Sequence, residues 1–258
     1  MDATVTEIYR YPVKGLSAEA LERVALSPGQ CLPHDRRFAI ALGTTEFDPG
    51  HPAWLSKSHF IMLMRDAKLA ELATRFDPQS GTLSVERGGQ ILLEACLTEP
   101  EGQRRIAAFF DEFMGGTVPG PLRVVEAAGH AFADSRPKPN ASTDKYVSLI
   151  NRNSIRDLAA RIGAEVDPIR FRANVYFNGP PAWRELEWLE REIVVGGARL
   201  RVIATITRCA ATEVNPATAE RDIPMVQELM RHYGHNLMGI YAEVLSAGDI
   251  AVGDALAV

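Results

Sequence analysis

The chain has few cysteines, and none of them forms a recognisable pair. Its 258 residues contain three, Cys31, Cys96 and Cys209, at wide spacings and without metal-type pairing, and Cys209 has no second cysteine or histidine near it. Structural zinc sites and disulfide frameworks use closely spaced or evenly numbered cysteines, so neither is expected. Reduced, scattered thiols are typical of a cytosolic protein. It remains open whether Cys209, beside Arg208 and before a turn-rich Asn-Pro segment, is a buried filler or a functional thiolate.

The chain also lacks a basic excess and long apolar runs. Lysine and arginine number 28 against 33 aspartate and glutamate, which gives a formal net charge of -5. General nucleic-acid binders usually carry positive charge, so no nucleic-acid partner is expected. No stretch approaches the roughly 20 apolar residues of a membrane-spanning helix, and the first residues lack a signal-peptide pattern. We therefore expect a soluble cytoplasmic protein with no membrane partner.

Common catalytic motifs are absent from the sequence. It contains no GxGxxG or Walker A sequence, no HExxH zinc motif and no GxSxG nucleophile turn. His232 and His235 form the one close histidine pair, but Gly234 lies between them and no carboxylate follows in register. A solvated helix end is the favoured interpretation of that pair. The scattered acidic residues single out no catalytic carboxylate pair.

Short strand patterns dominate the sequence that is present. The alternation of apolar and polar residues predicts strands or hairpins at 4–13, 21–29, 36–43, 69–95, 117–127, 146–151, 172–177, 191–204 and 239–258. Segment 59–66 fits either a strand or a buried helix. Helices are predicted at 102–116, 153–163 and 222–234, with Asn153 or Ser154 and Asp222 as N-caps. This pattern favours a mainly β fold with peripheral helices (α+β) over a doubly wound sheet. The Gly-Gly and two prolines around residues 116–121 indicate two domains, 1–118 and 119–258.

Five stretches in a fixed order carry a family resemblance. They are "YRYPVKGLSAEAL" (9–21), "PHDRRFAIA" (33–41), "FRANVYF" (171–177), "TRCAATEVNPATAERD" (207–222) and "VGDAL" (252–256). Together they resemble the MOSC family, and specifically its two-part members, which include amidoxime-reducing molybdoenzymes and their bacterial relatives. The resemblance covers nearly the whole chain. It implies an N-terminal β-barrel-like domain followed by a MOSC β-barrel from about residue 120.

The same resemblance implies a molybdenum cofactor (molybdopterin), a pyranopterin dithiolene with a terminal phosphate, bound between the two parts. The cysteine that matches Cys209 would ligate the metal directly. One protein thiolate is sufficient because the dithiolene supplies the other sulfurs, and a thiolate suits such a metal. The family resemblance also implies pyridoxal phosphate binding.

Cationic forks and amide donors suit a phosphate-bearing pterin. By resemblance, Lys14 and Arg36 match positions at the phosphate end, and Arg172 and Asn174 match the pair that holds the pterin. From the pattern alone, these last two alternate on one face of a buried strand, where an arginine needs an anionic partner such as a ligand or an acidic residue. The further candidate binding residues are Arg37, Ser142, Thr143, Thr207, Arg208 and Asn215. The Arg36-Arg37 doublet leaves open which arginine faces the pocket.

Two departures from the family pattern bear on function. Gly15 stands where some relatives have a serine, so one hydroxyl contact is missing. Some relatives carry a C-terminal ferredoxin-like domain with clustered cysteines, and this chain has none. Electrons are therefore expected from a separate reductase, such as a ferredoxin or flavoprotein.

Three functions follow as hypotheses. The first is a molybdenum-cofactor oxidoreductase that reduces small N-hydroxylated substrates such as amidoximes or hydroxylaminopurines, with Cys209 as its catalytic metal ligand. The second is a sulfur-carrier or cofactor-carrier protein, in which Cys209 bears a persulfide or holds the cofactor. The third is a non-catalytic binding domain without cofactor. In all three, Cys31 and Cys96 are expected to be fillers or surface thiols.

Overall fold

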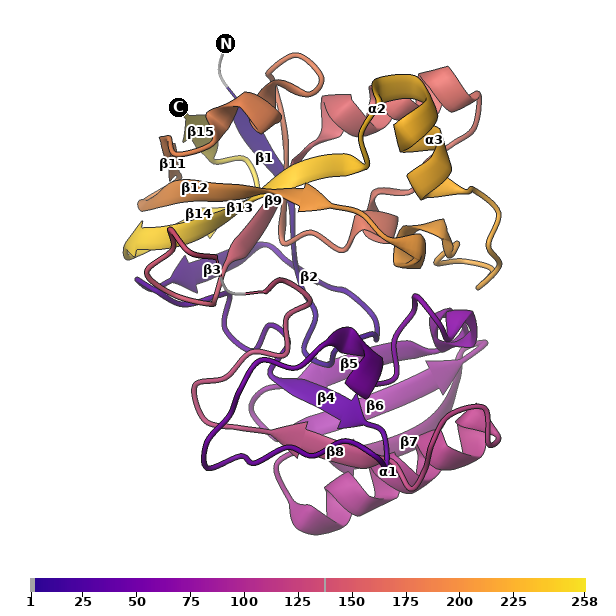
Figure 1. Ribbon diagram of the computed structural model, residues 1–258. Coiled ribbons are helices and arrows are strands. Elements are labelled where there is room, and N and C mark those ends of the chain that lie inside the picture. Colours follow the sequence, from indigo (N-terminus) through magenta and orange to yellow (C-terminus); the bar gives the residue numbers. More distant parts are fainter. Residues whose placement is uncertain (1–2, 137) are drawn as a thin grey trace.

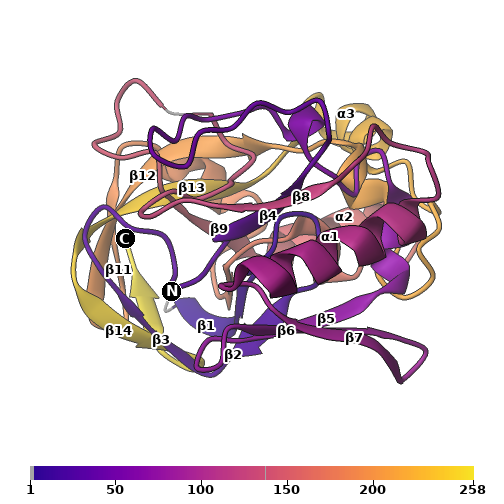
Figure 2. The same ribbon diagram turned by 90° about the horizontal axis from the view of Figure 1, so that it is seen from below.

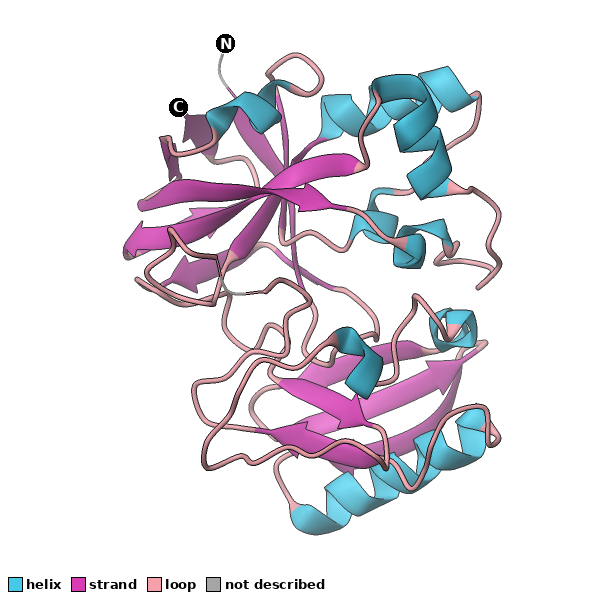
Figure 3. Cartoon of the chain, viewed as in Figure 1, coloured by secondary structure: helices cyan, strands magenta, loops and turns pink. Residues whose placement is uncertain are grey.

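The computed structural model describes residues 3–136 and 138–258, and it contains two stacked bodies, one above the other in Figure 1. The strands are β1 (Ala3–Arg10), β2 (Glu19–Leu21), β3 (Arg23–Leu26), β4 (Phe38–Ala41), β5 (Ala73–Asp77), β6 (Thr82–Arg87), β7 (Gln90–Cys96), β8 (Arg123–Glu126), β9 (Val147–Asn151), β10 (Val175–Asn178), β11 (Glu192–Val195), β12 (Ala198–Thr207), β13 (Leu237–Ser246), β14 (Gly248–Ala251) and β15 (Ala255–Ala257). The α-helices are α1 (Pro100–Met114), α2 (Arg152–Ile162) and α3 (Met225–Tyr233), and short 3₁₀ turns cover Lys57–His59, Ala67–Glu71, Pro168–Phe171, Arg184–Trp188 and Ala210–Glu213. Strands form both bodies and the helices lie at their periphery (Figure 3), which confirms the mainly β class.

The larger body, here called the barrel unit, is a closed barrel of seven strands. Its order is β10-β9-β13-β12-β11-β15-β1, and β1 pairs back with β10 to close it. Alternating residues of these strands point inward, so Val5 and Ile8 of β1 pack with Leu200, Val202 and others from the second half of the chain. Strands β9 and β10 run parallel, and helix α2 forms the crossover connection between them. Such a connection is needed because a tight turn cannot join parallel strands.

The smaller body, here called the small unit, is formed by residues 38–126. It combines the β4–β8 pair with the three-stranded sheet β5-β6-β7. Helix α1 packs against β7 and β8, as the view from below shows (Figure 2). The approach is close, because a Cβ on Gly102 of α1 would lie 2.0 Å from the carbonyl oxygen of Cys96. Ile106, Phe110 and Met114 bury the apolar face of α1 in this unit's core.

Strands β1, β2 and β3 belong spatially to the barrel unit, whereas Val13 and Leu16, between β1 and β2, pack in the core of the small unit. Strand β1 closes the barrel, β2 extends its sheet, and β3 pairs with β14. The chain then crosses to the small unit and returns through the segment before β9. The sequence division at residues 118 and 119 stays a prediction, while the packing interleaves the two ends of the chain.

The helix starts differ from the expectation. Asn151 caps α2, because its side chain accepts a hydrogen bond from the Asn153 backbone N–H, so the prediction of Asn153 or Ser154 as cap was wrong. Ser154 is instead buried against Glu185. Pro224 precedes α3, and Asp222, the predicted cap, forms an ion pair with Arg170.

Two predicted segments differ in the structure: 59–66 is neither the strand nor the helix that was expected, and the predicted strand 172–177 begins only at Val175. Segment 59–66 holds a bridge residue, Phe60, followed by a turn in which the Asp66 side chain accepts from the Met62 backbone N–H. Residues 172–174 lie before β10, because Arg172 ends a 3₁₀ turn in the left-handed conformation. The C-terminal segment 239–258 forms the end of β13 and two further strands, where two strands in all were predicted.

Among the described residues, none of the helices combines the length and apolar character that crossing a membrane would require.

Candidate functional site

A cavity of about 340 Å³ lies between the barrel unit and the small unit. It is lined by residues from both ends of the chain and from the segment that connects β8 to β9. Seven of the eleven predicted site residues line it, namely Lys14, Arg36, Arg172, Asn174, Thr207, Arg208 and Cys209. The chain places these residues together because β1 and β4 bring the N-terminal motifs beside the ends of β10 and β12.

Lys14 reaches the cavity from the segment that follows β1. Its backbone N–H donates to the Phe38 carbonyl (2.8 Å), which ties this segment to β4. The side chain is buried, donates from Nζ to the Phe132 carbonyl (3.0 Å) and pairs with Asp134. Burial lowers the pKa of Lys14, and the Asp134 charge opposes that effect. Gly15 beside it has φ 81°, and a Cβ there would lie 3.1 Å from the Ile61 carbonyl oxygen, so this position favours glycine over the serine of some relatives.

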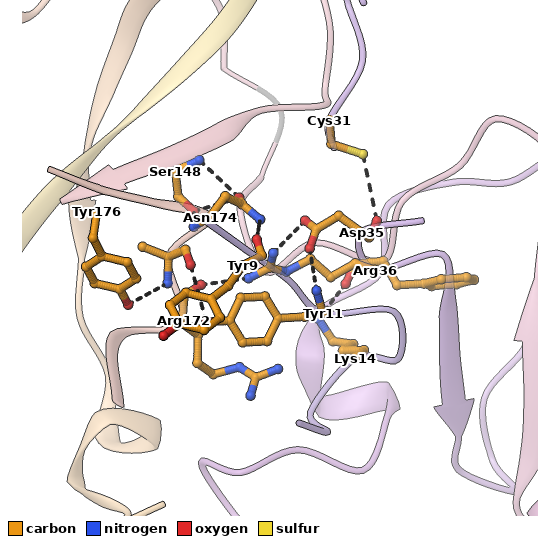
Figure 4. A network of polar contacts seen from close by, with 12 residues as sticks. Tyr9, Tyr11, Lys14, Cys31, Asp35, Arg36, Ser148, Arg172, Asn174 and Tyr176 are labelled. Atoms are coloured by element: carbon orange, nitrogen blue, oxygen red, sulfur yellow. Dashed lines mark hydrogen bonds and ion pairs between the residues drawn. The ribbon is translucent and has the colours of Figure 1, made fainter. Parts of the chain in front are cut away.

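Arg36 and Arg172 meet over the ring of Tyr11, as Figure 4 shows. Their guanidinium carbons lie 4.6 and 4.3 Å from the ring centroid. Both residues have positive φ, 49° and 52°, a conformation that costs a non-glycine residue about 1–3 kcal/mol and is often found at functional sites. Arg36 pairs with Asp35 (2.5 Å) and donates to the Arg172 carbonyl (2.9 Å). Burial by itself lowers the pKa of Arg36, but the negative charge of Asp35 outweighs this effect, so the pKa is raised and the guanidinium stays charged.

Arg172 has no carboxylate partner among the described residues. Its Nη1 donates to the Leu16 carbonyl (2.7 Å), which leaves most of its five N–H donors unused by the protein. Burial lowers the pKa of Arg172. The expected strand alternation with Asn174 was wrong, since Arg172 ends a turn, yet both residues line the cavity. Asn174 joins two strands by accepting from the Ser148 hydroxyl (2.8 Å) and donating to the Tyr9 carbonyl (3.1 Å).

Cys209 lies at the end of β12, where the chain enters a 3₁₀ turn. Its carbonyl accepts from the backbone N–H and the hydroxyl of Thr212 (3.0 and 2.9 Å), which fixes the turn. The residue is half-buried, and no hydrogen bond to its sulfur is found among the described residues. The structure therefore holds the cysteine backbone firmly and leaves its thiol available to the cavity.

The preceding residue, Arg208, is buried and locks three segments together. Its guanidinium donates to the Met238 carbonyl (2.9 and 2.6 Å) and to the Phe171 carbonyl (2.8 Å). No carboxylate pairs with it in the part of the chain that the structure describes, and burial lowers its pKa. Two of its N–H donors remain for a ligand.

Four predicted residues lie outside this cavity. Arg37 pairs with Glu126 (2.6 Å) and lines a neighbouring hollow of about 240 Å³, so Arg36 is the arginine of the doublet that faces the main cavity. Ser142 donates to Glu243 (2.9 Å), and Thr143 donates to the Gly29 carbonyl (3.0 Å). Asn215 donates to Asp222 (2.7 Å). The last three brace loops around the cavity.

Sequence reasoning missed several cavity residues. Cys31, expected to be a filler, lines both hollows, and burial together with Asp35 raises the pKa of its thiol to about 12. Arg170, Ser148 and Tyr241 also line the cavity, as do Lys57, Arg136, Lys138 and Lys145. The basic run "RPKPN" (136–140) was the one signal available for part of this set; Pro137 lies outside the described residues.

Two family profiles match the chain. The sequence profile of the MOSC domain matches residues 129–257, and that of the MOSC N-terminal beta barrel domain matches residues 2–120. The chain belongs to the MOSC family.

Individual MOSC relatives are distant. The molybdenum cofactor sulfurase of Caenorhabditis briggsae is 23% identical over 254 residues, which is 92% of this chain and 33% of that protein. The mitochondrial amidoxime reducing component 2 of Bos taurus is 28% identical over 120 residues, 42% of this chain and 35% of that protein. The chain thus matches about a third of the length of these curated relatives. Among solved structures, the YUAD protein from Bacillus subtilis aligns with a TM-score of 0.46 and 14% identity, covering 99% of this chain and 94% of that one.

The charge of this MOSC cavity is opposite to that of the whole chain. Its lining has nine cationic side chains, Lys14, Arg36, Lys57, Arg136, Lys138, Lys145, Arg170, Arg172 and Arg208, and two acidic ones, Asp35 and Asp134. The chain as a whole carries -5. Such a concentration of one sign in a hollow attracts anionic ligands. No cluster of three or more His, Cys, Asp or Glu side chains suited to a metal ion occurs among the described residues.

Proposed function

We propose that this MOSC protein binds the molybdenum cofactor in the cavity between its two units and reduces N-hydroxylated small molecules, such as amidoximes or hydroxylaminopurines. Electrons come from a separate reductase, a ferredoxin or a flavoprotein. The observation that carries the proposal is the neighbourhood of Cys209. Two arginines, the half-buried Arg172 and the buried Arg208, line its cavity without a carboxylate partner among the described residues.

The donor set fits such a group. Buried guanidinium groups need anionic or strongly polar partners, and a pterin with a terminal phosphate offers both. Lys14 and Arg36 would hold the phosphate end, while Arg172, Asn174, Thr207 and Arg208 would hold the pterin. The thiolate of Cys209 would ligate the metal, and its half-buried position at a fixed turn keeps it accessible.

The bound cofactor would supply the two-electron chemistry that breaks an N–O bond. Reduction of an N-hydroxyl group takes two electrons and two protons and releases one water. The protein's own part is to position the metal through Cys209, to neutralise the phosphate with its cations, and to hold the substrate in the cavity. Pyridoxal phosphate, which the family resemblance also implies, is not part of the proposal.

One observation favours sulfur or cofactor carriage as a second candidate function. The molybdenum cofactor sulfurase match extends over 92% of this chain, whereas the amidoxime reducing component match extends over 42%. In this case Cys209 would carry a persulfide or hold the cofactor for delivery, and the protein would not reduce N-hydroxylated compounds.

The test is molybdenum and pterin analysis of protein expressed in a host that makes the cofactor. Wild type, Cys209→Ser and the control Cys96→Ser are compared, since Cys96 lies in β7 of the small unit and is not a cavity residue. We expect near-stoichiometric molybdenum in wild type and control, and loss or altered absorbance in Cys209→Ser. Folded wild type without molybdenum would refute cofactor binding. Bound molybdenum without turnover of any N-hydroxylated substrate would support the carrier function.

A further inference from the structure

Four cations of the cavity form a separate group, here called the outer cations: Lys57, Arg136, Lys138 and Lys145. Three of them lie in the segment between β8 and β9, and Lys57 lies in a 3₁₀ turn of the small unit. They are half-buried or exposed, whereas Lys14 and Arg208 are buried. The outer cations thus line the more solvent-accessible part of the cavity.

The outer cations lack acidic partners within the described part of the chain. Arg136 instead lies over the Trp54 ring, 5.1 Å from its centroid. Lys145 donates to the neutral side chain of Gln30 (2.7 Å). By contrast, three other cavity cations are paired, namely Lys14 with Asp134, Arg36 with Asp35 and Arg170 with Asp222. The repulsion among the outer cations is therefore not offset by an ion pair with a carboxylate.

The segment that carries these lysines is held in place. The Lys138 backbone N–H donates to the Tyr146 hydroxyl (2.9 Å), and the Lys145 backbone N–H donates to the Thr143 hydroxyl (3.1 Å). Thr143 in turn donates to the Gly29 carbonyl, and Ser142 donates to Glu243. The two hydroxyl residues thus act as anchors for Lys138 and Lys145, which keeps both lysines at the cavity.

The proposed cofactor does not account for the outer cations. Its one phosphate carries about two negative charges, which the inner cations of the cavity already balance, because Arg172 and Arg208 add two positive charges that no carboxylate pairs with among the described residues. About four further positive charges remain on the outer side. A second anionic group, brought by the substrate, would complement them.

We propose that the cavity selects N-hydroxylated substrates that carry an anionic group, such as a phosphate monoester, and that Lys138 and Lys145 determine this specificity. The proposal deepens the function given above and rests on it. Each lysine–phosphate contact at a partly exposed position contributes about threefold in affinity, so the pair contributes about tenfold.

The experiment measures the binding of two probes by titration calorimetry. The protein is isolated from the cofactor-producing host, so that the inner arginines are occupied by cofactor and do not compete with the outer cations for the phosphate of the probe. The probes are 6-hydroxylaminopurine ribonucleoside and its 5′-monophosphate, at about 50 and 200 mM salt. Wild type is compared with Lys138→Gln/Lys145→Gln, with Arg172→Gln, and with Arg105→Gln, an exposed arginine on α1. We expect wild type and Arg105→Gln to bind the monophosphate about tenfold tighter than the nucleoside, with the preference reduced by salt and lost in the double lysine variant.

Three results would overturn the inference: equal affinity of wild type for both probes, a preference that survives the double lysine replacement, or a preference removed only by Arg172→Gln. The last result would place the phosphate on the inner arginines. Turnover of the same probes is assayed separately. A lysine-dependent phosphate preference without any N–O reduction would refute the reductase function and support the anion site. Reduction of both probes without the preference would support the reductase function and refute the anion site.

Discussion

Arg221 joins the turn that carries Cys209 to the small unit. Its Nη1 donates to the Ala210 carbonyl (2.6 Å), next to Cys209. Its Nη2 donates to the carbonyls of Leu63 (3.2 Å) and Met64 (2.7 Å), which line the cavity from the small unit. One side chain therefore connects two walls of the cavity, and Arg221→Ala should weaken that connection.

The magnitude follows from the contacts and the exposure. A hydrogen bond from a charged donor contributes about 1.5–3 kcal/mol when buried, and three are lost. The Arg221 side chain is 34% exposed, so water replaces much of each contact, and its pair with Glu213 at 3.6 Å adds little. We expect a net loss of about 1–2 kcal/mol in unfolding free energy, or about 2–8 °C in Tm for a chain of this size. If this free-energy loss affects only the contact between the two cavity walls, the fraction of molecules in which the walls have separated rises about 5- to 30-fold.

Differential scanning calorimetry measures the first effect. The rate of Cys209 alkylation, followed by peptide mass spectrometry, measures the second. Arg221→Lys should be intermediate, because one ammonium cannot reach all three carbonyls in the geometry of a guanidinium fork. Arg199→Ala is the matched control, since its pair with Glu192 joins two side chains that are each more than half exposed. An Arg221→Ala protein that melts within about 1 °C of wild type and shows unchanged Cys209 alkylation would refute the reasoning.

Two further predictions concern the scaffold. Gly102→Ala should destabilise the protein by about 1–3 kcal/mol in urea unfolding, because its Cβ would meet the Cys96 carbonyl oxygen at 2.0 Å, whereas Arg105→Ala on the exposed side of the same helix should change stability by less than about 0.5 kcal/mol. Glu185 is buried, and burial raises its pKa above 4.5 while hydrogen bonds from Ser154 oppose the shift. A raised pKa in the folded state means that the stability is present below pH 4.5 and is lost as the pH rises through the folded pKa. Glu185→Gln stays neutral, so its stability relative to wild type should increase between about pH 5 and 8 in thermal melts. A Tm difference between variant and wild type that stays constant or falls as the pH rises would contradict this.

The inner part of the site could be predicted from the sequence because its residues lie in short ordered motifs. Lys14, Arg36, Arg172 and Cys209 each sit one to four residues from a strand or turn whose pattern is visible in the chain. Their convergence in one cavity follows from the barrel and not from any local signal. The strand assignment for Arg172 failed because its left-handed backbone ends a turn, and alternation of residue types cannot distinguish that from a strand.

The outer part of the site could not be predicted. Lys138 and Lys145 lie in an irregular segment whose course depends on hydrogen bonds to distant residues, Gly29 and Glu243 among them. Ser142 and Thr143 were expected to contact the cofactor, but a hydroxyl in a polar loop can equally well brace the loop itself. Only the folded chain shows that their oxygens are used by the protein.

The interleaving of the two units explains why the cavity is built from both ends of the chain. Strand β1 pairs with β10 and β15, so a chain starting at residue 119 would lack the strand that closes the barrel. The same strand leads directly into Tyr11 and Lys14, so closing the barrel also places the ring that carries Arg36 and Arg172. Because Tyr11 is fully buried and burial raises the pKa of its hydroxyl to about 12, it stays neutral while both arginines stay charged. Closure of the barrel and assembly of the cationic cavity therefore depend on the same strand, and neither half of the sequence contains the site alone.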